Sequence, residues 1–169
     1  MRLKDKIAIV TGGASGFGEG IVRRFAMEGA RVAIADLHEE AAQKIAKDIG
    51  GIAVRTDVSH CHDVKALVKT VTDKWGGIDL LVNNAGIGHK PQPLDTLPEE
   101  IFDRILAVNA KSVYFTAREI VPLMKAAKRG AILNIASTGG VSPRPNLTWY
   151  NASKGWMITA TRAMAVELA

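Results

Sequence analysis

The 169-residue sequence predicts a doubly wound α/β fold, in which a parallel sheet carries helices on both of its faces. The first observation is that short apolar runs alternate with segments of helical period along the whole chain. The second is that turns rich in glycine, asparagine or serine follow several of these runs. Strands buried on both faces read as continuous apolar runs, and helices alternate with them in this class. We therefore expect one domain covering residues 1–169.

Five apolar runs are the predicted strands, and each is followed by a helical segment. In chain order the strands are KIAIV, RVAIA, GIAVRT, IDLLVN and AILNIAS. The predicted helices cover residues 17–28, 38–49 and 62–75, a longer stretch after the fourth strand, and a last segment from residue 150 onward. Loop-rich segments follow the fourth and fifth strands. Ligand sites of α/β proteins lie at such strand ends.

Composition excludes several classes of protein. The net charge of +5 arises from 22 basic and 17 acidic residues with no run of five like charges, so we expect no nucleic-acid partner. No apolar run reaches the ~18 residues that span a membrane, and the chain does not start with a signal segment. We therefore expect a cytoplasmic protein without a membrane partner. The single cysteine, Cys61, excludes an internal disulfide.

A glycine-rich turn directly after the first strand predicts a phosphate site. The stretch Thr11-Gly-Gly-Ala-Ser-Gly-Phe-Gly18 leads into a helix, so main-chain N–H groups and the positive helix end face an anion. The spacing G-x-x-x-G-x-G differs from the commonest dinucleotide pattern, and a simple tight turn is the alternative. The candidate cofactor-binding residues here are Gly12, Ser15, Gly16, Phe17 and Gly18.

Asp36 ends the second strand, 18 residues beyond Gly18, near the spacing of about 20 expected of a ribose-binding carboxylate. A carboxylate accepts hydrogen bonds from ribose hydroxyls and repels a 2′-phosphate. Neither Ser15 nor Leu37 supplies a cation for that phosphate. NAD is therefore favoured over NADP, and a helix N-cap is the alternative role for Asp36.

Two further strand ends carry candidate cofactor contacts. Asp57 and Val58 follow the third strand, and Asn84, Ala85 and Gly86 follow the fourth. Small residues let a ring or a ribose come close, and side-chain amides can bond to it. The alternative is a plain turn, since asparagine and glycine are usual turn residues.

Tyr150, one of only two tyrosines, stands four residues before Lys154 in the last helical segment. Residues i and i+4 share a helix face with Cβ atoms about 5–6 Å apart. An ammonium group at that distance favours phenolate and brings the phenol pKa down from its usual ~10. The pair therefore predicts a general acid/base. Tyr114 has Arg118 at the matching position, and we expect it to serve packing.

Taken together, these motifs resemble the short-chain dehydrogenase/reductase family, over essentially the whole chain. The resemblance rests on the stretches Thr11 to Gly18, Asn83 to Gly86 and Tyr150 to Lys154. Ser137 after AILNIA and Asn109 in Val-Asn match two more family positions. The resemblance implies a Rossmann-like fold, an NAD(H)-dependent oxidoreductase acting on a secondary alcohol or ketone, and a homo-oligomer, a dimer or homotetramer.

The family implies a role for each catalytic position. Tyr150 would donate or accept the proton and Ser137 would hold the substrate oxygen. Lys154 would bind the nicotinamide ribose and lower the tyrosine pKa, and Asn109 would support a water in the proton path. Elementary chemistry agrees, because two hydroxyl donors stabilise the negative charge that a ketone oxygen gains with the hydride. The cofactor itself carries the hydride.

The residues Ser59-His-Cys-His62 resemble a metal cluster, but adjacent positions of a helical turn point in different directions. We therefore predict no metal and expect Ser59 to cap the third helix.

The family resemblance also predicts further strands and a lid beyond the Tyr150 helix, where this sequence ends at Ala169. Those substrate-binding elements are expected to be absent, so the fold would be truncated after that helix. A non-catalytic dinucleotide-binding module is therefore one rival function, although a binding module needs no proton relay. A 3-oxoacyl-[acyl-carrier-protein] reductase using NADPH is another, and Asp36 counts against it. A methyltransferase has no use for the tyrosine–lysine pair.

Overall fold

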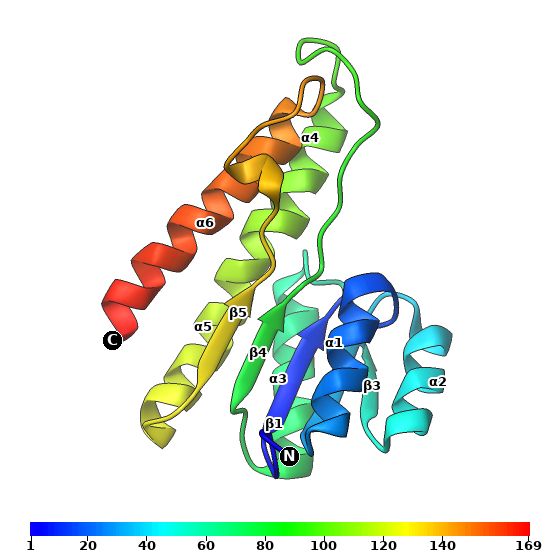
Figure 1. Cartoon of the computed structure of the whole chain (residues 1–169), viewed down its shortest axis with the longest axis vertical. Helices are drawn as coiled ribbons and strands as arrows, with labels where there is room; N and C mark the ends of the chain where they lie inside the picture. The colour runs from blue at the N-terminus through cyan, green and yellow to red at the C-terminus, as the bar shows by residue number, and fades with distance from the viewer.

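A computed structural model describes all residues, 1–169, and contains one five-stranded sheet (Figure 1). All its strands are parallel, in the order β3-β2-β1-β4-β5. The strands are β1 (Ile7–Thr11), β2 (Arg31–Asp36), β3 (Ile52–Arg55), β4 (Leu80–Asn83) and β5 (Ala131–Asn134). The helices are α1 (Gly16–Met27), α2 (Glu39–Ile49), α3 (Cys61–Trp75), α4 (Glu99–Leu106), α5 (Ser112–Ala127) and α6 (Thr148–Leu168). The predicted doubly wound parallel sheet is confirmed.

Each face of the sheet has its own apolar core, because side chains of a strand alternate between the two faces. Ile7 and Ile9 of β1 pack toward α3 and α5, whereas Ala8 and Val10 pack toward α1 and α2. All four are buried. Burial on both faces explains why the strand reads as an unbroken apolar run, and Figure 1 shows the two helical layers.

The strand order places a crevice between β1 and β4. The chain moves outward from β1 through β2 to β3 and then returns to the other side of β1 as β4. The loops after β1 and β4 therefore leave the sheet in opposite directions at its carboxyl edge. Open α/β sheets bind ligands at such switch points.

The long helical stretch after β4 is interrupted in a way that the sequence did not predict. A π-helical turn, η1 (Ala107–Lys111), separates α4 from α5, and a 3₁₀ turn, η2 (Thr138–Gly140), follows β5. α6 starts two residues before Tyr150. None of the helices combines the length and apolar character that crossing a bilayer requires.

Candidate active site

The glycine-rich turn after β1 packs against the segment that follows β4. Gly12 has a φ of 62°, and a side-chain carbon on it would lie 2.9 Å from the Ala85 Cα. Only glycine fits both the left-handed backbone and this close approach. α1 then begins at Gly16 after an extended Ser15, so its first turn presents main-chain N–H groups at the crevice. Phe17, also in this turn, is 86% exposed.

Thr11 joins this turn to the segment after β4, a role that the sequence analysis missed. Its hydroxyl oxygen accepts hydrogen bonds from the main-chain N–H groups of Asn84 and Ala85, each at 3.0 Å. The Asn84 amide in turn donates to the carbonyls of Thr11 and Gly12, both at 2.9 Å. Two loops that are more than 70 residues apart in sequence are thereby fixed as one surface. A polar residue closing an otherwise apolar strand was the available signal.

Asp36 is buried at the end of β2 and orders the glycine-rich turn directly. One carboxylate oxygen accepts the Ala14 N–H at 2.9 Å, and the other accepts the His38 N–H at the same distance. α2 begins only at Glu39 and has no side-chain cap, so the alternative role as a helix cap does not describe Asp36. No lysine, arginine or histidine side chain forms an ion pair with this carboxylate.

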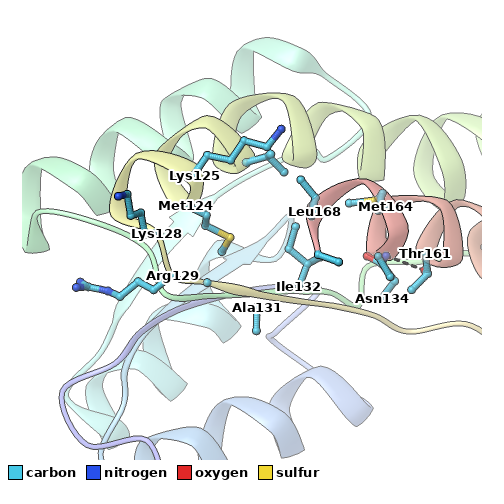
Figure 2. Close-up of a pocket in the computed structure, with 14 residues that line it drawn as sticks. Met124, Lys125, Lys128, Arg129, Ala131, Ile132, Asn134, Thr161, Met164 and Leu168 are labelled. Carbon is cyan, nitrogen blue, oxygen red and sulfur yellow. Dashed lines mark hydrogen bonds between the residues drawn. The ribbon is translucent and has the colours of Figure 1, made fainter.

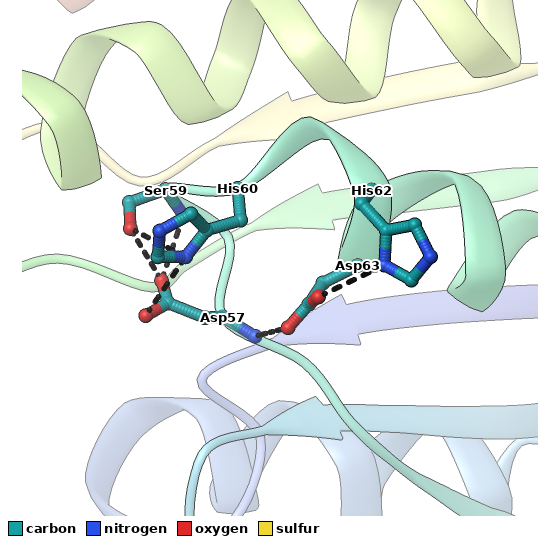
Figure 3. Close-up of polar contacts among 5 residues, drawn as sticks. All are labelled: Asp57, Ser59, His60, His62 and Asp63. Atoms are coloured by element: carbon teal, nitrogen blue, oxygen red, sulfur yellow. Dashed lines mark hydrogen bonds and ion pairs between the residues drawn. The ribbon is translucent and has the colours of Figure 1, made fainter.

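Asp57 lies two residues beyond β3 at the centre of a small polar cluster (Figure 3). Ser59 donates to one of its oxygens from the main chain at 2.9 Å and from the hydroxyl at 2.6 Å. Burial raises the pKa of Asp57, but these hydrogen bonds outweigh it and hold the pKa below its ordinary value. The expectation that Ser59 caps the third helix is wrong, because its hydroxyl is held by Asp57 and α3 starts at Cys61.

The two histidines beside this cluster contact separate carboxylates. His60 Nδ1 lies 3.3 Å from Asp57, and His62 Nδ1 lies 3.5 Å from Asp63. Figure 3 shows the rings apart from each other. No group of three or more metal-ligating side chains converges anywhere in the chain. Asp63 instead accepts the Asp57 N–H at 2.9 Å and orders the loop after β3.

A cleft of about 230 Å³ runs along these strand ends. The residues that line it include predicted contacts at four strand ends, namely Gly12, Asp36, Asp57, Val58, Ala85 and Gly86. Arg104 of α4 also lines the cleft, and the sequence analysis did not single it out. The structure thus brings six of the thirteen predicted cofactor contacts into one hollow.

Lys154 and Asn109 meet across Gly86 at the carboxyl end of β4. A side-chain carbon on Gly86 would lie 3.2 Å from Lys154 Nζ and 3.4 Å from Asn109 Oδ1. Lys154 is 4% exposed, and its ammonium donates to the Ile135 carbonyl at 2.8 Å. Burial lowers the pKa of this lysine, because no carboxylate pairs with it.

Asn109 lies in the π-helical turn, and both the oxygen and the nitrogen of its side-chain amide form hydrogen bonds to neighbouring segments. Its oxygen accepts the Ile87 N–H at 2.8 Å, and its nitrogen donates to the Ile87 carbonyl and to Ser153 Oγ, each at 2.9 Å. The Ser153 hydroxyl in turn donates a hydrogen bond to the Tyr150 carbonyl at 2.7 Å. π-turns inserted into α-helices recur at functional sites. Ser153 was missed from the sequence, although it lies three residues after Tyr150.

Ser137 and Tyr150 lie near the two ends of the segment that joins β5 to α6, beside the site of Lys154 and Asn109. Ser137 precedes η2, and its Oγ accepts the Gly139 N–H at 3.1 Å. Tyr150 lies in the first turn of α6, with its ring edge 3.6 Å from where a side-chain carbon on Gly88 would stand. The phenol makes no hydrogen bond within the chain, and no hydrogen bond joins the side chains of Ser137, Tyr150 and Lys154. These hydroxyls remain available to a ligand.

A larger hollow, of about 530 Å³, lies elsewhere (Figure 2). It is formed by the end of α5, the outer edge of β5 and the end of α6, with Met124, Ile132, Met164 and Leu168 on its walls. Its rim is basic through Lys125, Lys128 and Arg129. None of the predicted site residues lines it, so size alone does not locate the chemistry.

Comparison with known proteins places this geometry among oxidoreductases. Residues 6–169 match the sequence profile described as short chain dehydrogenase. A 4-formylbenzenesulfonate dehydrogenase from Comamonas testosteroni is 44% identical over 174 residues, which cover all of this chain and 69% of the relative. A galactitol 2-dehydrogenase from Agrobacterium fabrum is 40% identical, with 99% of this chain and 66% of that protein covered.

A solved structure agrees with this match. The 3-ketoacyl-(acyl-carrier-protein) reductase from Brucella melitensis, crystallised with NADH, superposes with a TM-score of 0.96 at 48% sequence identity. The superposition covers 98% of this chain and 71% of that one.

Proposed function

The chain belongs to the short chain dehydrogenase family of oxidoreductases, and from that premise we propose that it transfers a hydride between NAD(H) and a secondary alcohol or ketone. One observation carries the proposal. Buried Lys154 and Asn109 converge on Gly86, beside a tyrosine whose phenol is free of internal partners. A binding module has no need for a buried ammonium group without a carboxylate partner, four residues along the same helix from a free phenol.

The residues present suit a dinucleotide. The glycine-rich turn and the start of α1 would hold the pyrophosphate, Asp36 the adenosine ribose, and Asp57 with Val58 the base. Asn84, Ala85, Gly86 and Lys154 would hold the nicotinamide half. The carboxylate of Asp36, which has no cation beside it, favours ribose hydroxyls over a 2′-phosphate. When bound, the nicotinamide would supply or take the hydride.

The catalytic side chains would control the proton and the developing charge. Tyr150 would give a proton to the ketone oxygen during reduction and take it back during oxidation. Ser137 would donate a second hydrogen bond to the same oxygen, stabilising its negative charge in the transition state. The Lys154 ammonium would stabilise the phenolate form of Tyr150. Both amide hydrogens of Asn109 are already used in hydrogen bonds. Asn109 would therefore hold a water by accepting a hydrogen bond from it at one of its own oxygen atoms.

A second candidate is an NADPH-using reductase of 3-oxoacyl-carrier-protein substrates. The likeness to the Brucella melitensis reductase favours its acyl-carrier-protein substrate, but that structure holds NADH. Use of NADPH requires tolerance of a 2′-phosphate, which Asp36 opposes. Assembly into a dimer or homotetramer through α5 and α6 remains part of the proposal. Both helices expose large side chains, Tyr114 at 54% and Trp156 at 44%.

The test is an absorbance assay of reduced nicotinamide with a panel of secondary alcohols and ketones, each offered with NAD(H) and with NADP(H). We expect turnover that is faster with NAD(H). Turnover restricted to an acyl thioester with NADPH would select the second candidate. Tight dinucleotide binding without turnover of any panel member would instead favour the non-catalytic module.

A further inference from the structure

Arg104 on α4 lines the cleft at the strand ends, and the proposed chemistry gives it no role. It is the only lysine or arginine among the residues that line this cleft. Its guanidinium forms no ion pair and no hydrogen bond within the chain. Glu100, four residues earlier on the same helix, stands at the spacing that suits an ion pair, but the two side chains do not form one. Arg104 is therefore available to a ligand in the cleft.

The other residues of the cleft show which part of a dinucleotide Arg104 would meet. The lining includes residues 56–59, the segment after β3 that is proposed to hold the base. Residues 15–18, which are proposed to hold the pyrophosphate, do not line it. Asp36 does line it and would repel a phosphate on the ribose. Arg104 is thus placed at the base and not at a phosphate group.

Apolar side chains give the cleft surfaces on which a flat ring can lie. Leu37 and Val58 contribute them from the strand ends, and Val108, four residues after Arg104, contributes from the helical side. A guanidinium is planar and weakly hydrated, and it stacks on aromatic faces. Arg104 therefore continues the helical side of the cleft with a cation that can serve a ring without an anion beside it.

Asp57 adds a hydrogen-bond acceptor at the strand ends. One of its carboxylate oxygens takes both hydrogen bonds from Ser59. The other oxygen has only the exposed His60 ring near it, at 3.3 Å, and retains capacity for a further donor. A ligand that combines an amino group with an aromatic face suits this carboxylate and the guanidinium together. Adenine has both features.

We propose that the Arg104 guanidinium stacks on the adenine ring of the bound dinucleotide, while Asp57 accepts a hydrogen bond from the adenine amino group. This inference rests on the proposed function, which places the base in this cleft. The face of an aromatic ring carries negative charge and attracts a cation within about 6 Å of its centre. Arg104 is then a binding residue for the adenine half of the cofactor and does not act on the nicotinamide half.

The test compares NADH with reduced nicotinamide mononucleotide, which carries a phosphate but no adenine. We expect Arg104→Leu to weaken NADH binding about 3- to 30-fold in fluorescence titrations, the range of one cation–π contact, and to change mononucleotide binding less than about 2-fold. Arg104→Lys keeps the charge without the planar face and should recover only part of the NADH affinity. Arg31→Leu removes the same charge from the exposed start of β2 and is the matched control. Equal losses for both ligands would indicate attraction to phosphate and overturn the proposal, as would no loss for either.

ADP-ribose separates this inference from the proposed function. It contains the adenine half without nicotinamide, so its binding, measured by calorimetry, needs no hydride transfer. We expect the same loss of about 3- to 30-fold in Arg104→Leu. Binding that depends on Arg104 without turnover of any alcohol or ketone would count only against the proposed function. Turnover with an ADP-ribose affinity that does not depend on Arg104 would overturn only the inference, and a wild-type chain that does not bind ADP-ribose would overturn both.

Discussion

Two buried aspartates at opposite edges of the sheet have opposite surroundings. Asp79, at the start of β4, accepts the Ile7 N–H at 2.9 Å and is paired with Arg129 at 2.7 Å. Asp36, at the end of β2, accepts only main-chain N–H groups and has no cation beside it. Their exposures are nearly equal, 6% and 8%. At the amino ends of the strands, called here the amino edge, the buried charge is therefore neutralised within the chain. At their carboxyl ends, the carboxyl edge, it is not.

The two cations of these regions repeat the contrast. Arg129 is paired with Asp79, whereas Lys154 is buried beside a carbonyl without a carboxylate partner. A buried charge without a counter-ion is unfavourable for folding and is concentrated at functional sites. The comparison leads to a general expectation. Changes at the amino edge should alter stability, and changes at the carboxyl edge should alter ligand binding and turnover.

The largest expected effect is that of Tyr150→Phe on turnover. Loss of a positioned acid/base should lower kcat by at least about 100-fold, with NADH affinity nearly unchanged. Unfolding free energy should change by less than about 0.5 kcal/mol, because the phenol has no partner in the chain. Tyr114→Phe, which alters the other tyrosine, is the control. Turnover within a few-fold of wild type would remove Tyr150 from the mechanism.

Asp79→Ala is the matching change at the amino edge. It leaves the buried Ile7 N–H without an acceptor and removes the ion pair with Arg129. We therefore expect the unfolding free energy to fall by about 2–3 kcal/mol in urea titrations. Arg129→Gln should cost less than about 1 kcal/mol, because the arginine is 64% exposed. NADH affinity measured in the folded protein should be unchanged in both variants. A large loss of affinity with intact stability would break the division between the two edges.

Asp36→Ala tests the carboxyl edge with a smaller effect. The change removes the proposed ribose acceptor and frees the Ala14 N–H, so NAD should bind about 10-fold more weakly and NADP should bind better. Asp48→Ala on α2, where Asp48 pairs only with exposed Arg23, is the control. Fluorescence titration with both cofactors gives the ratio of the NAD and NADP dissociation constants. A wild-type protein that prefers NADP would show that Asp36 does not bind the ribose.

The sheet could be predicted from the sequence, and the candidate site residues could be proposed from it, because their signals are local. A strand buried on both faces must be apolar along its length, and a helical tyrosine–lysine pair is read from its spacing. The π-turn at Asn109 had no such signal, since AVNAK is ordinary helical sequence. Its amide bonds to Ile87 and Ser153 are tertiary contacts. Ser59 failed as a cap for a related reason, because the nearby carboxylate of Asp57 competes for its hydroxyl.

The role of the Thr11 hydroxyl could not be predicted from local sequence either. It depends on the segment after β4, more than 70 residues later in the chain. Spacing within one element identifies catalytic pairs, but it does not show which polar atoms the folded chain leaves without partners.

The smallest expected effect is the acid response of the amino edge. Burial raises the pKa of Asp79, but the hydrogen bond from Ile7 and the pairing with Arg129 outweigh it and hold the pKa below its ordinary value. Since the folded pKa is below the unfolded value of about 3.9, the unfolded chain binds more protons, and stability falls with decreasing pH in that range. The contribution is complete well above pH ~4 and is lost as the pH drops through the folded pKa. Asp79→Asn removes the titration, so the difference in unfolding free energy between wild type and this variant should be constant near neutrality and narrow below about pH 4. A difference that stays constant down to pH ~2 would show that Asp79 and Arg129 do not form the ion pair on which the contrast between the two edges depends.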